Sequence, residues 1–274
     1  MEATSVVKIA KYEFLAYRLL LRVFLGKKRR DRFIIKNRMS YIDFLPIFYG
    51  NRTIQSPEGF KAVPRLKTDD FYLLFQDREK EVREHFHMHP GETFVDVGSN
   101  VGFYSLLLAK INPDITIISI EAHPDNFEAL NTNIKINNFK NIISINKAIT
   151  NHNIGKLRLY EYWTGKGQKN TGRFDVLNRQ DTKCFKNIDC DSLDNLLKSM
   201  DNTIYVIKID IEGEEVNALL GAKNTLKKTR KIIVETHSDD NLYQVKQILL
   251  SYQFRIEIFK SGMTFVIGTK EVFI

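Results

Sequence analysis

The sequence predicts an α/β fold with a doubly wound, mostly parallel sheet that ends in an antiparallel hairpin strand. The first observation is that short apolar runs alternate with longer helix-favouring segments from about residue 93 to residue 250. The second is that most of these runs end in acidic residues or in a glycine-containing turn. The length of 274 residues suits one large domain with an appendage. We therefore expect a basic N-terminal extension over residues 1–50 and an α/β domain over residues 51–274.

The extension contains the whole charge excess of the chain. The formal net charge is +8, and residues 1–40 contain 11 Lys and Arg against 3 Asp and Glu. The other residues therefore carry equal numbers of basic and acidic side chains. A polyanion or an anionic membrane would be attracted by the first forty residues and not by the body of the protein.

Residues 6–25 form an apolar run that predicts a helix, and Gly26 offers a stop. Its basic residues fall on one stripe, and the basic cluster 27–30 follows directly. Three interpretations stay open: the helix packs on its own domain, lies on an anionic membrane surface, or contacts nucleic acid or a partner. We expect no secretory leader, because no basic start is followed by an unbroken apolar core. No apolar stretch is long enough to span a membrane, and Cys184 and Cys190 show no zinc or redox spacing. We expect a cytoplasmic protein, with peripheral membrane contact through residues 1–40 as one alternative.

The elements of the body follow in order. Residues 59–63 and 71–74 are interpreted as strands or a hairpin that lead into the sheet, and residues 77–88 as a helix. The main alternation then predicts strands at 93–97, 115–120, 142–145, 204–209 and 231–235, with helices at 103–110, 124–137, 213–226 and 240–250. Residues 254–259 and 264–267 are joined by a short link and must pair as a hairpin. The interval 151–200 is an insertion, with a strand at 156–162 and a loop at 164–172.

Ligands of open α/β sheets bind beyond the carboxyl ends of the strands, so these ends indicate the site. The first strand ends at Asp96 and leads into a turn with Gly98 and Gly102. Glycine lets a ligand approach the backbone, and the next helix offers free N–H groups. Glu121 stands 23 residues after Gly98, where a carboxylate can accept hydrogen bonds from both hydroxyls of a ribose. The pattern indicates a nucleoside cofactor.

The identity of the cofactor depends on two residues. Asn100 stands where a dinucleotide-binding turn has its second glycine, which disfavours NAD. Asp96 would repel a pyrophosphate and attract a ligand with an amino group and a sulfonium. S-adenosylmethionine fits these charges.

The fourth and fifth strands end in the residues that we expect to act in catalysis. Asp210 and Glu212 face the same side if the strand end stays extended, and His237 follows the fifth strand. An alcohol acceptor must lose its proton, and these three residues are candidates for the base. Lys208 belongs to the same candidate catalytic group, because its charge can neutralise the neighbouring acids. Structural alternatives are that Asp210 or Glu212 stabilises the start of the next helix and that His237 is a cap or loop residue.

The sequence gives no full set of metal ligands. The spacing of His85, His87 and His89 cannot place all three on one helix face. Asp210 and Glu235 could hold a divalent ion, but no third ligand is indicated. We therefore predict no metal.

Four motifs together resemble the FkbM-type class I S-adenosylmethionine-dependent methyltransferases, which have a Rossmann-like fold. They are Phe94-Val-Asp-Val-Gly-Ser-Asn-Val-Gly-Phe-Tyr-Ser105, Ile120-Glu-Ala-His-Pro124, Ile207-Lys-Ile-Asp-Ile-Glu-Gly-Glu-Glu215 and Val234-Glu-Thr-His237. The resemblance implies that Glu121 binds the ribose, that residues 147–149 line the adenine and that Asp210 faces the reaction centre. The full cofactor-binding set is Asp96, Gly98, Ser99, Asn100, Gly102, Glu121, Ala122 and Ala148.

The resemblance implies O-methylation of a hydroxyl group on a sugar, a glycolipid or another small-molecule or natural-product acceptor. One alternative is an RNA methyltransferase that uses the basic extension. It is disfavoured because the body is neutral and has no Asn-Pro-Pro-Tyr type motif. Another is a non-catalytic nucleoside-binding or membrane-docking module, which is disfavoured because burying acidic strand ends without a function is costly. The sequence does not indicate the oligomeric state.

Overall fold

The computed structural model describes residues 51–66, 68–75, 79–153, 155–163, 169–175, 185–200 and 204–270, together with six positions between residues 15 and 27. The predicted basic helix and its membrane contact therefore lie almost wholly outside the described residues. All six positions are exposed, including the apolar side chains of Leu15, Leu19 and Val23. None of the helices in the described part combines the length and the apolar character needed to cross a bilayer.

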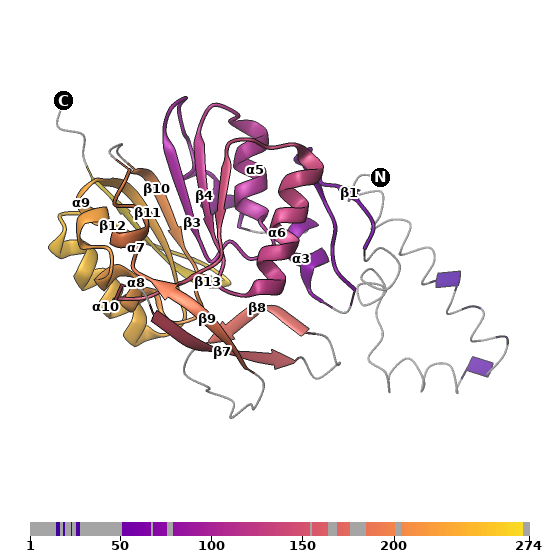
Figure 1. The fold of residues 1–274 in the computed structure, drawn as a ribbon. Helices are drawn as coiled ribbons and strands as arrows, with labels where there is room; N and C mark the ends of the chain where they lie inside the picture. Colours follow the sequence, from indigo (N-terminus) through magenta and orange to yellow (C-terminus); the bar gives the residue numbers. More distant parts are fainter. Residues whose placement is uncertain are drawn as a thin grey trace.

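The predicted α/β sheet is confirmed. Its seven strands have the order β12-β13-β11-β10-β3-β4-β5 (Figure 1). Their bounds are β3 (Thr93–Val97), β4 (Thr116–Ile120), β5 (Ile142–Ile145), β10 (Ile204–Ile209), β11 (Thr229–Thr236), β12 (Arg255–Ser261) and β13 (Met263–Thr269). The five strands from β11 to β5 are parallel, and β13 runs antiparallel between β11 and β12. The C-terminal hairpin therefore completes one side of the sheet, as predicted.

Helices cover both faces of this sheet. α5 (Phe103–Ile111) and α6 (Pro124–Asn137) lie on one side, and α8 (Glu215–Leu220), α9 (Lys223–Lys227) and α10 (Asp239–Ser251) lie on the other (Figure 1). Burial on both faces explains why the central strands are mostly apolar. The helix predicted at 213–226 is split at Gly221, where a Cβ atom would lie 2.2 Å from the carbonyl oxygen of Thr150.

The segment that leads into the sheet differs from the prediction in part. β2 (Lys61–Ala62) lies within the predicted run 59–63 and forms a hairpin with β1 (Ile54–Gln55), a strand that was not predicted. The strand predicted at 71–74 is wrong, because these residues belong to α3 (Asp70–Phe75). Phe71, Leu74 and Phe75 are buried at helical spacing, a period that a run of four apolar residues does not reveal. The helix predicted at 77–88 is reduced to α4 (Lys80–Arg83), which follows Glu79 in a left-handed conformation.

The insertion forms a second sheet that the sequence did not predict. Its order is β6-β9-β7-β8, with β6 (Ala148–Ile149), β7 (Gly155–Trp163), β8 (Lys169–Asp175) and β9 (Phe185–Asp191). β7 confirms the strand predicted at 156–162. β8 occupies part of the predicted loop, whose residues 164–168 lie outside the described residues. α7 (Leu193–Leu196) follows β9 and leads back to the main sheet.

The ends of β3 and β10 approach each other closely at Gly98. The backbone N–H of Asp210 donates to the carbonyl of Val97 at 3.0 Å. Gly98 has a φ of +80°, and a Cβ atom there would lie 1.8 Å from the carbonyl oxygen of Asp210. Real Cβ atoms do not tolerate such a contact with backbone, so this glycine is required by the packing of two strand ends as well as by its conformation.

We predict that Gly98→Ala destabilises the fold by about 3 kcal/mol or more, because the two strand ends must separate. Gly91→Ala is the matched control, since Gly91 has a φ of +82° and open space around it. This control should lose only about 1–2 kcal/mol of stability, which is the cost of the left-handed conformation for alanine. Urea denaturation of both variants measures the difference, and equal losses would contradict the packing role.

Candidate active site

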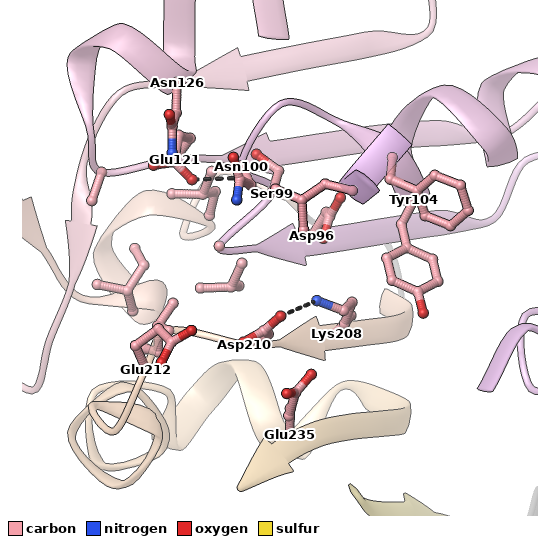
Figure 2. Close-up of a pocket in the computed structure, with 18 of the residues that line it drawn as sticks. Asp96, Ser99, Asn100, Tyr104, Glu121, Asn126, Lys208, Asp210, Glu212 and Glu235 are labelled. Carbon is pink, nitrogen blue, oxygen red and sulfur yellow. Dashed lines mark hydrogen bonds and ion pairs between the residues drawn. The ribbon is translucent and has the colours of Figure 1, made fainter. Parts of the chain in front are cut away.

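A cavity of about 820 Å³ opens at the carboxyl ends of β3, β4, β10 and β11. Its volume lies in the range of small-molecule and cofactor sites. Most of the residues predicted from the sequence line it (Figure 2). They are Asp96, Gly98, Ser99, Asn100, Glu121, Ala122, Lys208, Asp210, Glu212 and His237.

Two of the residues predicted to bind the cofactor do not line the cavity. Gly102 has a φ of +100° at the start of α5, and a Cβ atom there would lie 2.6 Å from Leu130. It therefore allows α5 to pack against α6. Ala148 is buried in the second sheet, whereas its neighbours Lys147 and Ile149 line the cavity.

The turn after β3 has buried polar atoms that lack a protein partner. The Ser105 hydroxyl donates to Oδ2 of Asp96 at 2.6 Å, which leaves Oδ1 without a hydrogen bond. Oγ of Ser99 is likewise buried without a hydrogen bond among the described residues. Buried polar groups normally have partners, so these two atoms indicate a polar ligand. A carboxylate and a hydroxyl suit the ammonium and carboxylate groups of an amino acid moiety, and burial raises the pKa of Asp96.

Glu121 is held by the backbone on both sides. Oε2 accepts from the N–H of Asn100 and Oε1 from the N–H of His123, both at 2.8 Å. A carboxylate has about four acceptor positions, so Glu121 can still accept from a ligand hydroxyl. Burial raises the pKa of Glu121 to about 7, although these N–H groups favour its charged form. Asn126, which the sequence analysis missed, lines the cavity beside it.

Lys208 is a buried cation between the acidic strand ends. Its side chain lies 3.1 Å from Oδ2 of Asp210 and 5.0 Å from the centre of the Tyr104 ring. Burial alone would lower its pKa, but Asp210 and Asp96 raise it above the usual value for lysine. A permanently charged ammonium cannot take up a proton, so Lys208 stabilises the acids and does not serve as the base.

Four titratable groups meet at the ends of β10 and β11. Nε2 of His237 lies 3.8 Å from Oδ1 of Asp210, 3.8 Å from Oε1 of Glu235 and 3.6 Å from Oε2 of Glu212. Burial and the charge of Asp210 raise the pKa of Glu235 to about 8. Burial would lower the pKa of His237, but the surrounding carboxylates raise it to about 9. The sequence placed Glu235 at a strand end but did not include it among the site residues.

Glu215 is a second residue that the sequence analysis missed. Its Oε1 accepts from the N–H groups of Ile211 and Gly213, and lies 3.1 Å from Nδ1 of His237. Glu215, rather than Asp210 or Glu212, therefore stabilises the turn that leads into α8. Glu212 has a φ of 57°, so the strand end is not extended as assumed, and the turn itself brings Asp210 and Glu212 to the cavity.

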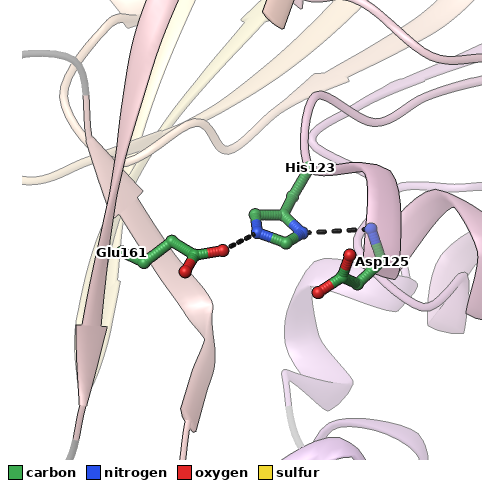
Figure 3. Close-up of side chains that lie close together, drawn as sticks. All are labelled: His123, Asp125 and Glu161. Carbon is green, nitrogen blue, oxygen red and sulfur yellow. Dashed lines mark hydrogen bonds and ion pairs between the residues drawn. The ribbon is translucent and has the colours of Figure 1, made fainter. Parts of the chain in front are cut away.

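A second group of His and acidic residues joins α6 to β7 (Figure 3). Nδ1 of His123 accepts from the N–H of Asp125 at 3.2 Å, so Nε2 carries the proton that it shares with Glu161 at 2.5 Å. Lys186 pairs with Asp125 at 2.6 Å. Because both ring nitrogens are used within the protein, this group is a structural link. His85, His87 and His89 do not gather into a metal-binding group in the described part of the chain.

The mostly parallel sheet, the glycine turn with its unsatisfied atoms and the buried carboxylate after the second strand define a class I S-adenosylmethionine-dependent methyltransferase. The family model of the methyltransferase FkbM domain matches residues 96–256, which is more than half of the chain. The protein belongs to the FkbM methyltransferase family, and S-adenosylmethionine is its cofactor. No curated protein matches the sequence significantly.

Several solved structures are similar to this chain at low identity. Precorrin-6y C5,15-methyltransferase from Geobacter metallireducens is 10% identical, with a TM-score of 0.45 over 71% of this chain and 90% of that chain. TYW2 from P. horikoshii in complex with MeSAdo is 14% identical, with a TM-score of 0.42 over 79% and 69%. The N-terminal domain of human METTL16 in complex with SAH is 15% identical, with a TM-score of 0.42 over 69% and 66%. The family assignment does not depend on them.

We predict that S-adenosylhomocysteine binds more tightly as the pH rises from 6 to 8. Glu121 has a pKa of about 7 in the free protein, and its ionised form accepts more hydrogen bonds from a ribose. Binding should therefore release about half a proton at pH 7. Calorimetry in two buffers of different ionisation enthalpy measures this release.

Glu121→Gln is the control for this titration. The variant should bind about 10–100-fold more weakly, because a hydrogen bond to a charged group contributes roughly 1.5–3 kcal/mol. It should also lose the proton release. An unchanged pH dependence in the variant would assign the titration to another group and contradict the role of Glu121.

Proposed function

We propose that the protein transfers a methyl group to a hydroxyl of a sugar, a glycolipid or another small molecule. The observation that supports this most strongly is the set of carboxylates at the ends of β10 and β11, namely Asp210, Glu212 and Glu235, beside the cofactor residues in one cavity. Carboxylates accept a hydrogen bond from a hydroxyl and can take up its proton. They would hold an amine in its ammonium form, which has no lone pair for attack. The charge of the site therefore favours oxygen over nitrogen as the acceptor atom.

The residues divide into two groups. Asp96, Ser99 and Glu121 would hold the cofactor through the buried atoms described above. When bound, S-adenosylmethionine supplies a methyl group that is already activated by its sulfonium. The protein must then align the acceptor oxygen, exclude water and remove one proton. Asp210, fixed by Lys208 at 3.1 Å, is placed to orient the acceptor.

The same charges disfavour a nucleic acid acceptor. Asp69 and Glu79 line the cavity in addition to the strand-end acids. A phosphate backbone would be repelled by this surface. A neutral polyol or phenol meets no such repulsion.

We predict that Asp210→Asn lowers kcat by about 10²-fold or more, because misplacing the acceptor oxygen costs about that much. The affinity for S-adenosylhomocysteine should change less than about threefold, because the residue lies outside the cofactor-binding group. Turnover is measured as S-adenosylhomocysteine release with the best acceptor from a panel of hydroxylated sugars and phenols, and NMR locates the methyl group in the product.

Asp240→Asn, a matched substitution on the exposed start of α10, should change neither quantity. Equal turnover in the wild type and in Asp210→Asn would remove Asp210 from the mechanism. A methylated nitrogen in the product would contradict the proposed function.

A further inference from the structure

We propose that Asp210, Glu235 and His237 bind a divalent first-row metal ion, and that this ion holds the acceptor hydroxyl. The inference rests on the proposed function and deepens it, because it names how the acceptor end of the cavity recognises its substrate. The sequence alone offered Asp210 and Glu235 without a third ligand. The structure adds His237, which follows Glu235 by two residues and turns towards both carboxylates.

The three donor atoms have the separations of a metal site. Nε2 of His237 lies 3.8 Å from Oδ1 of Asp210 and 3.8 Å from Oε1 of Glu235, and all three atoms lie within 4.8 Å of one another. A point equidistant from three such atoms lies roughly 2.2–2.4 Å from each, close to the bond lengths of divalent ions to oxygen and nitrogen. Only small side-chain movements are needed to complete the site.

The second observation concerns the surroundings of Glu235 and His237. The Glu235 side chain is 7% exposed and has the charged groups Lys208 and His237 as neighbours. It points into the cavity towards the end of β10 (Figure 2). Nε2 of His237, the ring nitrogen that faces Asp210 and Glu235, is buried without a hydrogen bond. Buried polar groups normally have hydrogen-bond partners, so a buried nitrogen without one indicates a ligand.

Neighbouring residues orient the ligand atoms. Oε1 of Glu215 lies 3.1 Å from Nδ1 of His237, and Glu215 is itself fixed by the N–H groups of Ile211 and Gly213. A carboxylate behind the distal nitrogen is the usual support of a metal-bound imidazole. Lys208 occupies Oδ2 of Asp210 and leaves Oδ1 for the ion. Each ligand therefore presents one atom to the same point.

Three protein ligands on one side leave coordination positions open towards the cavity. Two oxygens and one imidazole nitrogen suit ions such as Mn²⁺, Fe²⁺ or Zn²⁺. Two neighbouring hydroxyls of a sugar or a phenol can fill two open positions, so the acceptor class that we infer is a vicinal diol. Coordination lowers the pKa of the bound hydroxyl.

The reaction then balances without a further reactant. The proton passes from the coordinated hydroxyl to Glu212, whose Oε2 lies 3.6 Å from Nε2 of His237. The acceptor oxygen forms a bond to the methyl carbon as the bond from that carbon to the sulfonium sulfur breaks. The products are a methyl ether and S-adenosylhomocysteine.

Titration of Mn²⁺ into the full-length protein with S-adenosylhomocysteine present tests the site. Electron paramagnetic resonance of the free ion should show one bound Mn²⁺ per chain, and spin-echo spectra should show coupling to an imidazole nitrogen. Glu235→Gln and His237→Gln should each weaken binding at least tenfold, and His237→Gln should abolish the nitrogen coupling. Glu161→Gln, a matched change in the other His and acid group, should leave both signals unchanged.

The proposal is overturned if the folded wild-type protein binds no Mn²⁺, or if Glu235→Gln binds it as tightly as the wild type. Methyl transfer to a hydroxyl that continues at full rate in excess EDTA also overturns it, while leaving the proposed function intact. Conversely, site-specific Mn²⁺ binding without methyl transfer to any hydroxyl in the panel contradicts the proposed function alone. The two failures are therefore distinguishable.

Discussion

The buried ammonium of Lys208 is the interaction on which the site depends. Asp96, Asp210 and Glu235 come from three adjacent strands, and their mutual repulsion in a buried cavity would oppose the ionised forms. Lys208 is 3% exposed at the carboxyl end of β10, the strand between β3 and β11. The acids on both sides stabilise its charged form and raise its pKa. The strand order thus determines which residue can neutralise these acids, because only a residue on the middle strand lies next to the acids of both neighbouring strands.

The contact of Gly98 with the backbone of Asp210 joins the two halves of the cavity. The cofactor residues follow β3 and β4, whereas the residues that we assign to the acceptor follow β10 and β11. Because a side chain at Gly98 would collide with the carbonyl of Asp210, the turn that we assign to the cofactor also fixes the strand end that we assign to the acceptor. A methyl transfer requires this kind of fixed relation between donor and acceptor, since alignment supplies much of the rate enhancement.

The sequence predicted the main sheet and most of the cavity because both follow from local rules. Parallel strands buried on two faces are apolar runs, and their carboxyl ends meet at one edge, so Asp96, Glu121 and Asp210 were found without coordinates. The second sheet, the helix α3 and the role of Glu215 depend on pairings between distant segments and were not foreseen. Ala148 and Gly102 do not line the cavity, because tertiary contacts determine which way the two-residue strand β6 faces and how α5 packs on Leu130.

A crystal structure of the protein with S-adenosylhomocysteine tests the central claim most directly. We predict that the ligand lies across the carboxyl ends of β3 and β4, with both ribose hydroxyls hydrogen-bonded to the carboxylate of Glu121. Its sulfur atom should face the side of the cavity formed by Asp210 and Glu235. A ligand bound outside this cavity, or with its ribose away from Glu121, would contradict the assignment of the site.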